Sequence, residues 1–324
     1  MDIYVKKAII HQFSPDYTDL YLADKFLNIT PKIEEYLRKK IERVYSDEAR
    51  TGIFEEDNPF LEMISDDLLE TSVAVANRWK EEFVVSENQK TNDLVFIQFS
   101  KEGVDHFAFL RIALRETLTH LGGEVDNPIK LTQNNLPGFG TGADEALVIN
   151  LQSRKYHLIE KRIKYNGTFL NYFSENLLQA QPKISPKKSI KALEKTAQKI
   201  AESFNTDDFQ FQSKVKSAIF NHIEEENKLS PEKLADDLFN DNLTARLSFI
   251  DQVKEAVPEP VTFEEIDASR QLKKFENQKL SLSNGIELIV PNNVYEDAES
   301  VEFILNENGT YSILIKNIED IQSK

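Results

Sequence analysis

The sequence contains no cysteine, and this absence excludes several kinds of chemistry. Without thiols there can be no disulfide, no thiol nucleophile and no zinc site that needs thiolate ligands. The five histidines are scattered, and none has the HExxH or HxxxH spacing that pairs ligands on one helix face. We therefore expect neither a metal site nor another cofactor.

Long apolar segments are also missing. No apolar run approaches the roughly 18 residues of a membrane span, and no basic-then-apolar segment marks the start as a signal peptide. A hydrophobic content of 40% and a charged content of 29% are typical of a folded globular chain, and 324 residues suffice for two or three domains. The sequence predicts a cytoplasmic protein that makes no membrane contact.

Positive charge is scarce overall but concentrated in one place. The chain has 39 Lys and Arg against 55 Asp and Glu, a net charge of −16, which argues against binding a polyanion over the whole surface. Between Arg154 and Lys199, however, eleven basic residues face three glutamates, which gives 11 − 3 = +8 and leaves −24 for the rest. Any contact with nucleic acid is expected to be local.

The most ordered part of this basic stretch is a helix predicted from Ser185 to Phe204. Ser185 suits the cap and Pro186 the first turn, and neither glycine nor proline follows. At 3.6 residues per turn, apolar side chains form one stripe: Ile190, Leu193, Ala197, Ile200 and Phe204. Five lysines fall on the opposite face: Lys187, Lys188, Lys191, Lys195 and Lys199. That face is either an ordinary solvated surface or a phosphate-binding surface.

The pattern along the chain predicts an α+β protein in three parts. Residues 1–165 are expected to form a mixed domain of strands and helices, 166–257 a helical region, and 258–324 a small antiparallel sheet with Asn-Gly hairpins at Asn284 and Asn308. In the helical region, helices are expected at 167–178, 207–227 and 242–256, with another starting at Ser230-Pro231.

Within the first part, residues 3–12, 17–22, 93–99, 104–115 and 146–151 are expected to be strands, with helices starting at Thr30-Pro31 and Asn58-Pro59. The second helix is predicted to run to about Phe83. Gly138, Gly140 and Gly142 form a GxGxG pattern, but the preceding Gln133-Asn134-Asn135 has loop composition, so a flexible loop is favoured over a nucleotide cradle.

Catalytic motifs are missing as well: there is no GxSxG elbow and no GxxxxGK[ST] loop. Glu226-Asn227-Lys228 lies in a helical pattern and lacks an upstream partner aspartate on a strand. Carboxylates at 55–70 could hold Mg²⁺, which leaves a metal-dependent phosphodiesterase as a lesser alternative. We expect a protein that is not an enzyme.

Several short segments resemble the bacterial 37-kDa nucleoid-associated proteins of the NdpA or YejK type. They are Ala8–Gln12, Val44–Ser46 with Gly52–Glu56, Phe263, Leu272–Phe275 and Gly285–Leu288, and the mass of 37.3 kDa agrees. The resemblance implies a non-enzymatic bacterial protein at the nucleoid, with DNA and a type II topoisomerase as possible partners. It supplies no DNA-contact motif.

The charge pattern and the resemblance lead to one main hypothesis, in which a local basic surface contacts DNA phosphates without reading bases. The residues expected to form it are the five lysines of the helix, Lys187, Lys188, Lys191, Lys195 and Lys199, with Arg154, Lys155, Lys161, Arg162 and Lys164. The alternative is an acidic protein-interaction module that docks on a DNA-handling enzyme such as a type II topoisomerase. Apolar helix stripes would serve a homo-oligomer equally well.

Overall fold

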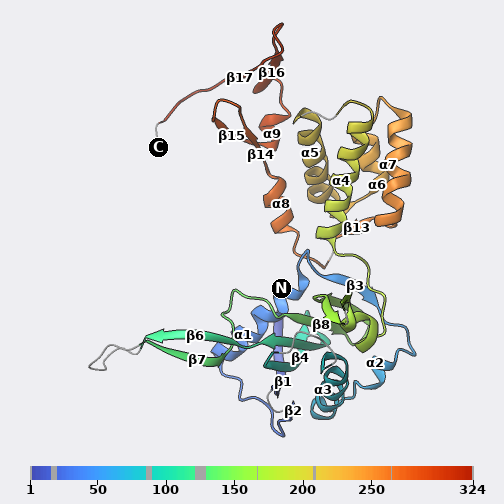
Figure 1. Cartoon of the computed structure of the whole chain (residues 1–324), viewed down its shortest axis with the longest axis vertical. Helices are drawn as coiled ribbons and strands as arrows, with labels where there is room; N and C mark the ends of the chain where they lie inside the picture. The colour runs from blue at the N-terminus through green and yellow to red at the C-terminus, as the bar shows by residue number, and fades with distance from the viewer. Residues whose placement is uncertain are drawn as a thin grey trace. The chain divides into compact units, whose positions relative to one another are not determined.

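The computed structural model describes residues 2–15, 20–84, 90–120, 129–165, 167–206, 209–263 and 265–322. Its contacts group the chain into two compact units, Met1–Ser185 (unit 1) and Pro186–Lys324 (unit 2). The ribbon in Figure 1 contains both helices and a large antiparallel sheet, so the predicted α+β class is confirmed. The predicted division at residues 165 and 257 stays a prediction.

Unit 1 is organised around a seven-stranded antiparallel sheet. Its order is β2 (Leu20–Tyr21), β1 (Ile3–Phe13), β4 (Asn92–Lys101), β5 (Val104–Ala113), β8 (Glu145–Asn150), β9 (Lys155–Ile159) and β3 (Arg50–Ile53). The central strands are buried almost throughout because both faces of the sheet are covered. The predicted hairpin of β4 and β5, with its turn at Lys101-Glu102-Gly103, is confirmed.

The two faces of the sheet carry separate cores, since side chains alternate along each strand. On one face, Val95 and Ile97 pack with α1 (Pro31–Glu42) and the short 3-10 helix η1 (Arg43–Tyr45). On the other, Phe96 and its neighbours pack with α2 (Pro59–Glu62), α3 (Leu68–Val84) and the π-helical turn η2 (Phe173–Leu177).

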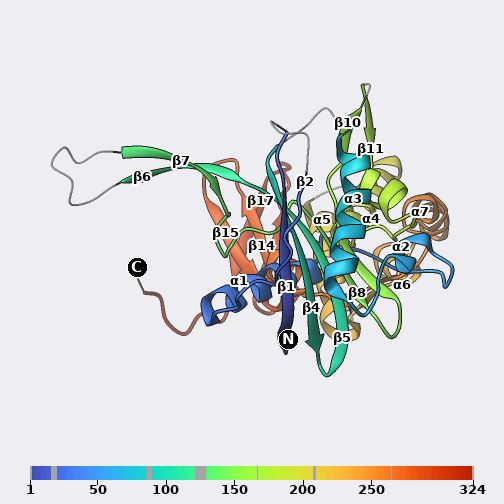
Figure 2. The ribbon, with the colours of Figure 1, turned by 90° about the horizontal axis from the view of Figure 1, so that it is seen from below.

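A two-stranded arm extends from the sheet. It consists of β6 (Arg115–His120) and β7 (Ile129–Asn135), and Figures 1 and 2 both show it projecting from the body of unit 1. A second small hairpin joins β10 (Ile163–Tyr165) to β11 (Thr168–Leu170).

Unit 2 begins with four helices around one apolar core: α4 (Pro186–Ser203), α5 (Phe209–Glu226), α6 (Pro231–Leu238) and α7 (Leu243–Ala256). Two short strands, β12 (Lys228–Leu229) and β13 (Val261–Thr262), pair with each other, and α8 (Ser269–Phe275) follows β13. Two hairpins complete the unit: β14 (Asn277–Ser281) with β15 (Glu287–Pro291), then α9 (Asn292–Tyr295), then β16 (Val301–Leu305) with β17 (Tyr311–Ile315).

Several local predictions need correction. The helix expected from Pro59 to Phe83 is two helices, because the Asp67 carboxylate accepts a hydrogen bond from the Leu69 amide at 2.9 Å and starts α3 anew. Residues 133–135 belong to strand β7 instead of a loop, paired with β6. The segment 167–178 forms β11 and η2 in place of an α-helix. Of the strand expected at 17–22, the structure shows Leu20–Tyr21, and residues 16–19 lie outside the described part.

Lys228, read as part of a helical pattern, is instead the first residue of strand β12, whereas the loop predicted around the three glycines is confirmed. The glycines at 138, 140 and 142 lie in a loop, whose carbonyls at Gly138 (2.9 Å) and Thr141 accept hydrogen bonds from the buried Lys40 ammonium. Burial, together with nearby Arg43 and Arg115, lowers the pKa of Lys40 to about 8. The predicted C-terminal antiparallel structure consists of two separate two-stranded hairpins, with Gly285 and Gly309 at positive φ in their turns.

Candidate nucleic-acid interface

Helix α4 packs against the other helices of unit 2 through a stripe of apolar side chains on one of its faces. Ile190, Leu193, Ala197 and Ile200 are each at most 2% exposed, and they pack into the core shared with α5, α6 and α7. Phe204, just past the end of the helix, is partly buried against the same core. Burial of these side chains fixes the rotation of α4 about its axis, and with it the direction of the opposite face.

All five lysines of α4 are exposed on that opposite face: Lys187, Lys188, Lys191, Lys195 and Lys199. Lys188, Lys191, Lys195 and Lys199 form no ion pair with any residue that the structure describes. At 1.5 Å per residue, Lys187 and Lys199 are separated by about 18 Å along the helix, which is the length of about five phosphates on one DNA strand. The helix thus presents a row of positive charges on a scale that suits a nucleic-acid backbone.

Two glutamates on α4 reduce its formal charge to 5 − 2 = +3, within a unit that carries 17 − 26 = −9. The Glu194 carboxylate is paired with Lys274 at 3.2 Å. The Glu202 carboxylate accepts a hydrogen bond from the Gln198 amide at 3.2 Å. Glu194 therefore already has a cation of its own outside the helix, and the lysine face remains the most basic surface of α4.

The five basic residues predicted from unit 1 are not gathered in the same way. Arg154 and Lys155 stand at the start of β9, whereas Lys161 and Arg162 follow its end, and a five-residue strand separates them by about 16 Å. Lys164 lies on β10 and is exposed. These five residues therefore do not share one helix face, in contrast to the lysines of α4.

Two of these unit 1 residues already have carboxylate partners. Lys161 Nζ lies 2.7 Å from Asp144 Oδ1, and Arg154 Nη1 lies 3.8 Å from Glu56 Oε2. Burial acts to raise the pKa of Asp144, but hydrogen bonds from Lys161 and from the Ala113 amide outweigh it and hold that pKa below its ordinary value. Lys161 therefore serves the local structure of unit 1 as an ion-pair partner.

Unit 1 also contains a buried polar cluster that sequence reasoning missed. Arg111 Nε donates to Glu145 Oε2 at 2.6 Å, and Tyr172 Oη donates to the same oxygen. Trp79 Nε1 donates to Tyr172 Oη at 3.1 Å. Burial raises the pKa of Glu145 despite its Arg111 partner. The signal was an arginine in an otherwise apolar strand at 107–112, which indicates a paired internal charge.

The acidic segment at 55–70, considered for a metal site, shows no such arrangement. Among the residues that the structure describes, no three His, Cys, Asp or Glu side chains are grouped so that they could hold a metal ion. Asp67 caps α3, and Glu70 accepts a hydrogen bond from the Ser65 hydroxyl at 3.0 Å. The carboxylates of Asp67 and Glu70 therefore stabilise the start of α3.

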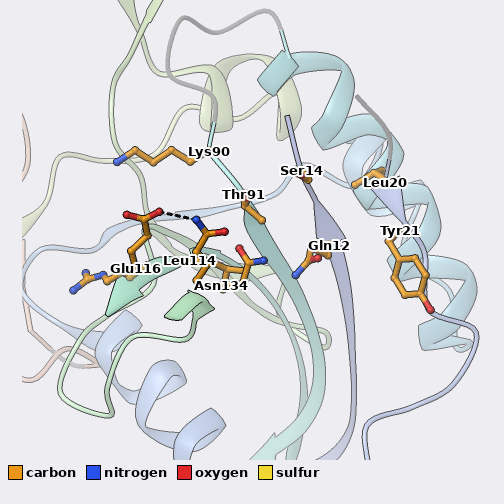
Figure 3. Close-up of a pocket in the computed structure, with 11 residues that line it drawn as sticks. Gln12, Ser14, Leu20, Tyr21, Lys90, Thr91, Leu114, Glu116 and Asn134 are labelled. Carbon is orange, nitrogen blue, oxygen red and sulfur yellow. Dashed lines mark hydrogen bonds between the residues drawn. The ribbon is translucent and has the colours of Figure 1, made fainter. Parts of the chain in front are cut away.

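An open cavity of about 1110 Å³ lies in unit 1 where the arm leaves the sheet (Figure 3). Amides, hydroxyls and apolar groups line it with one acidic and two basic side chains, Glu116, Lys90 and Arg115. Glu116 accepts a hydrogen bond from Gln133 at 3.2 Å. This mixed lining shows no preference for an anionic or a cationic ligand.

Comparison with protein families finds a family that matches almost the whole chain. The family model described as nucleoid-associated protein YejK aligns with residues 9–321, which is nearly the whole chain. The chain belongs to this family. The resemblance noted in the sequence is therefore confirmed, and the family of nucleoid-associated protein YejK is not a known enzyme family. No curated protein matches the sequence. None of the described helices is long and apolar enough to cross a membrane.

Proposed function

We propose that this member of the family of nucleoid-associated protein YejK binds DNA through the lysine face of α4, in the nucleoid of a bacterial cytoplasm. The observation that supports this is the geometry of α4, whose apolar side chains from Ile190 to Ile200 are buried while all five lysines are exposed. Lysine contacts phosphates as a point charge, so the face would bind DNA without reading its bases. Lys188, Lys191, Lys195 and Lys199 are the contacts with no competing ion pair among described residues.

The basic residues of unit 1 have a lesser role in this proposal. Lys155, Arg162 and Lys164 are exposed and would add to attraction at longer range. Arg154 and Lys161 would first have to leave Glu56 and Asp144. We assign the main contact to α4, because its five lysines share one exposed helix face, and a supporting one to the basic residues of unit 1.

The test is a titration of fluorescent duplex DNA with the whole protein and with the triple variant Lys188→Glu, Lys191→Glu, Lys195→Glu. The control is Lys25→Glu, Lys32→Glu, Lys130→Glu, which makes the same change in net charge at exposed lysines of unit 1. We expect the α4 variant to lose affinity at least about a hundredfold and the control to lose far less. Equal losses in both variants would mean that overall charge, and not this face, governs binding.

A second candidate function is supported by the acidic balance of unit 2, −9 in total. In it, the protein docks on a basic surface of a DNA-handling enzyme, such as a type II topoisomerase, and reaches the nucleoid without direct DNA contact. A pull-down from nuclease-treated lysate separates the two functions. Retention of such an enzyme without DNA favours docking, whereas its loss favours direct DNA binding.

A further inference from the structure

The C-terminal hairpin of unit 2, β16 and β17, leaves unusually many apolar side chains in solvent. They are exposed by 40 to 62%, in the order Leu305, Tyr311, Leu314, Ile315 and Ile304. A two-stranded hairpin is marginally stable alone, and an exposed apolar edge strand invites pairing with another chain. The hairpin therefore has the properties of a surface that a partner covers.

One side of the hairpin is already anchored to the helices. The ring of Phe209 at the start of α5 meets Phe303 and Tyr311 edge-on, with centroids 5.1 and 5.2 Å apart, and Tyr295 lies 5.3 Å from Phe303. Phe303 and its register partner Ile313 share the side that faces Phe209. Side chains alternate along a strand, so the neighbouring residues Ile304 and Leu314 lie on the other side. The hairpin is thus fixed on its Phe209 side, and the surfaces that it exposes are the other side and the outer edge of β17.

The hydrogen-bond register shows which backbone groups that edge presents. The Asn306 amide donates to Thr310 at 2.8 Å and the Lys316 amide to Ser300 at 2.9 Å, so both are hydrogen-bonded pairs of the ladder. Alternation then makes Ile313 a non-hydrogen-bonded position, whose N–H and C=O point away from β16. The same holds for Tyr311 and Ile315. No strand that the structure describes pairs with this edge.

The charge around the hairpin indicates which kind of partner would bind to this edge. Residues 296–322 contain seven carboxylates and one lysine, 1 − 7 = −6, and that lysine, Lys316, is paired with Glu302 at 2.6 Å. DNA would be repelled, and two copies of the hairpin would repel each other. A segment that brings both apolar side chains and positive charge is attracted.

We propose that the outer edge of β17 binds an extended, basic segment of another protein as an added strand. The backbone of the segment would pair with Tyr311, Ile313 and Ile315, its apolar side chains would cover Leu314 and its neighbours, and its lysines or arginines would meet the surrounding carboxylates. This site is separate from the lysine face of α4 and does not depend on DNA binding. For the second candidate function, docking on a DNA-handling enzyme, it supplies a binding site and a class of ligand.

The experiment titrates the whole protein into a short, capped, fluorescent peptide that alternates lysine with valine, with a glutamate–valine peptide as the control. We expect the basic peptide to bind and the acidic one not to. Ile313→Pro removes the outward N–H without touching a hydrogen bond to β16, and should weaken binding at least about tenfold. Ile313→Ala keeps that N–H and loses a side chain, so it should weaken binding far less.

Leu314→Lys is a second variant that leaves the backbone unchanged. Because it adds a positive charge and removes exposed apolar surface, it should also weaken the basic peptide. DNA affinity should be unchanged in these hairpin variants, and the α4 triple variant should bind the peptide as the wild type does. Equal binding of both peptides, or unchanged binding by Ile313→Pro and Leu314→Lys, would overturn the proposal. A dimer that becomes a monomer in Ile313→Pro would overturn it too, by showing that a second copy is the occupant.

Discussion

Units 1 and 2 use charge in different ways. In unit 1, charged side chains lie inside the fold, among them Lys40, Asp93, Arg111 and Glu145, each at most 8% exposed. In the described part of unit 2, the buried polar residues are all uncharged: Ser189, Ser213, Ser217, Gln271, Gln278 and Asn292. Charged side chains are therefore part of the interior of unit 1, whereas in the described part of unit 2 they lie at or near the surface, where partners can meet them.

The buried pair of unit 1 should show the largest effect on stability. Arg111→Met leaves Glu145 buried without its cation, and we expect it to lower the free energy of unfolding by about 3–5 kcal/mol. Chemical denaturation measures the loss. The double variant Arg111→Met, Glu145→Met should recover most of it, because no unpaired charge then remains. A single variant as stable as the wild type would show that the pair is not needed for the fold.

Substitutions on the two faces of α4 should affect different properties, the stability of the fold on the apolar face and DNA binding on the lysine face. Leu193→Ala removes a fully buried side chain and should lower the free energy of unfolding by about 2–5 kcal/mol. Lys191→Ala, on the opposite face, should change it by no more than about 0.5 kcal/mol and yet weaken DNA binding. Denaturation and DNA titration of the same two variants check this. A stability loss in Lys191→Ala would mean that the lysine face supports the fold.

His11 of unit 1 should make stability depend on pH. Its Nδ1 accepts from the Ala23 amide at 3.1 Å, and Nε2 lies 2.9 Å from the Ser72 hydroxyl, which suits the neutral ring. Burial lowers the pKa of His11 from 6.5 to about 4. Between these values the unfolded chain binds the proton and the folded one does not, so stability falls as pH falls, by up to about 3 kcal/mol. NMR titration of the ring checks the pKa, and a value near 6.5 would contradict the account.

The ion pair of Lys161 and Asp144 should contribute little to stability or to DNA binding. The lysine side chain is 63% exposed, so Lys161→Ala should cost at most about 1 kcal/mol of stability. It should leave DNA affinity almost unchanged, in contrast to Lys191→Ala on α4. Comparable losses of DNA affinity in the two variants would remove the distinction between the basic residues of the units.

Periodicity and turn chemistry in the sequence were enough to predict much of this fold. They placed α4 with its stripe, the hairpin of β4 and β5, and the C-terminal hairpins, because each is specified by residues close together in the chain. The break between α2 and α3 and the strand at Gln133 were missed. The first depends on a side-chain cap, and the second on pairing with β6.

The candidate site could be predicted only in part for a similar reason. The lysine face follows from spacing within one helix, so the sequence alone places it. The ion pairs of Lys161 with Asp144 and of Arg154 with Glu56 join residues that the fold brings together. The exposed edge of β17 depends on what does not pair with it, which no local pattern in the sequence reveals.

If the lysine face of α4 contacts phosphates, the affinity for DNA should fall as the salt concentration rises, because each neutralised phosphate releases counterions. Contact with about four phosphates gives a slope near −3.6 when the logarithm of affinity is plotted against the logarithm of salt concentration. The variant Lys188→Glu, Lys191→Glu, Lys195→Glu should reduce the slope to about −1 or less, and the unit 1 control variant should keep it. An unchanged slope in the α4 variant, or affinity indifferent to salt in the wild type, would contradict the account.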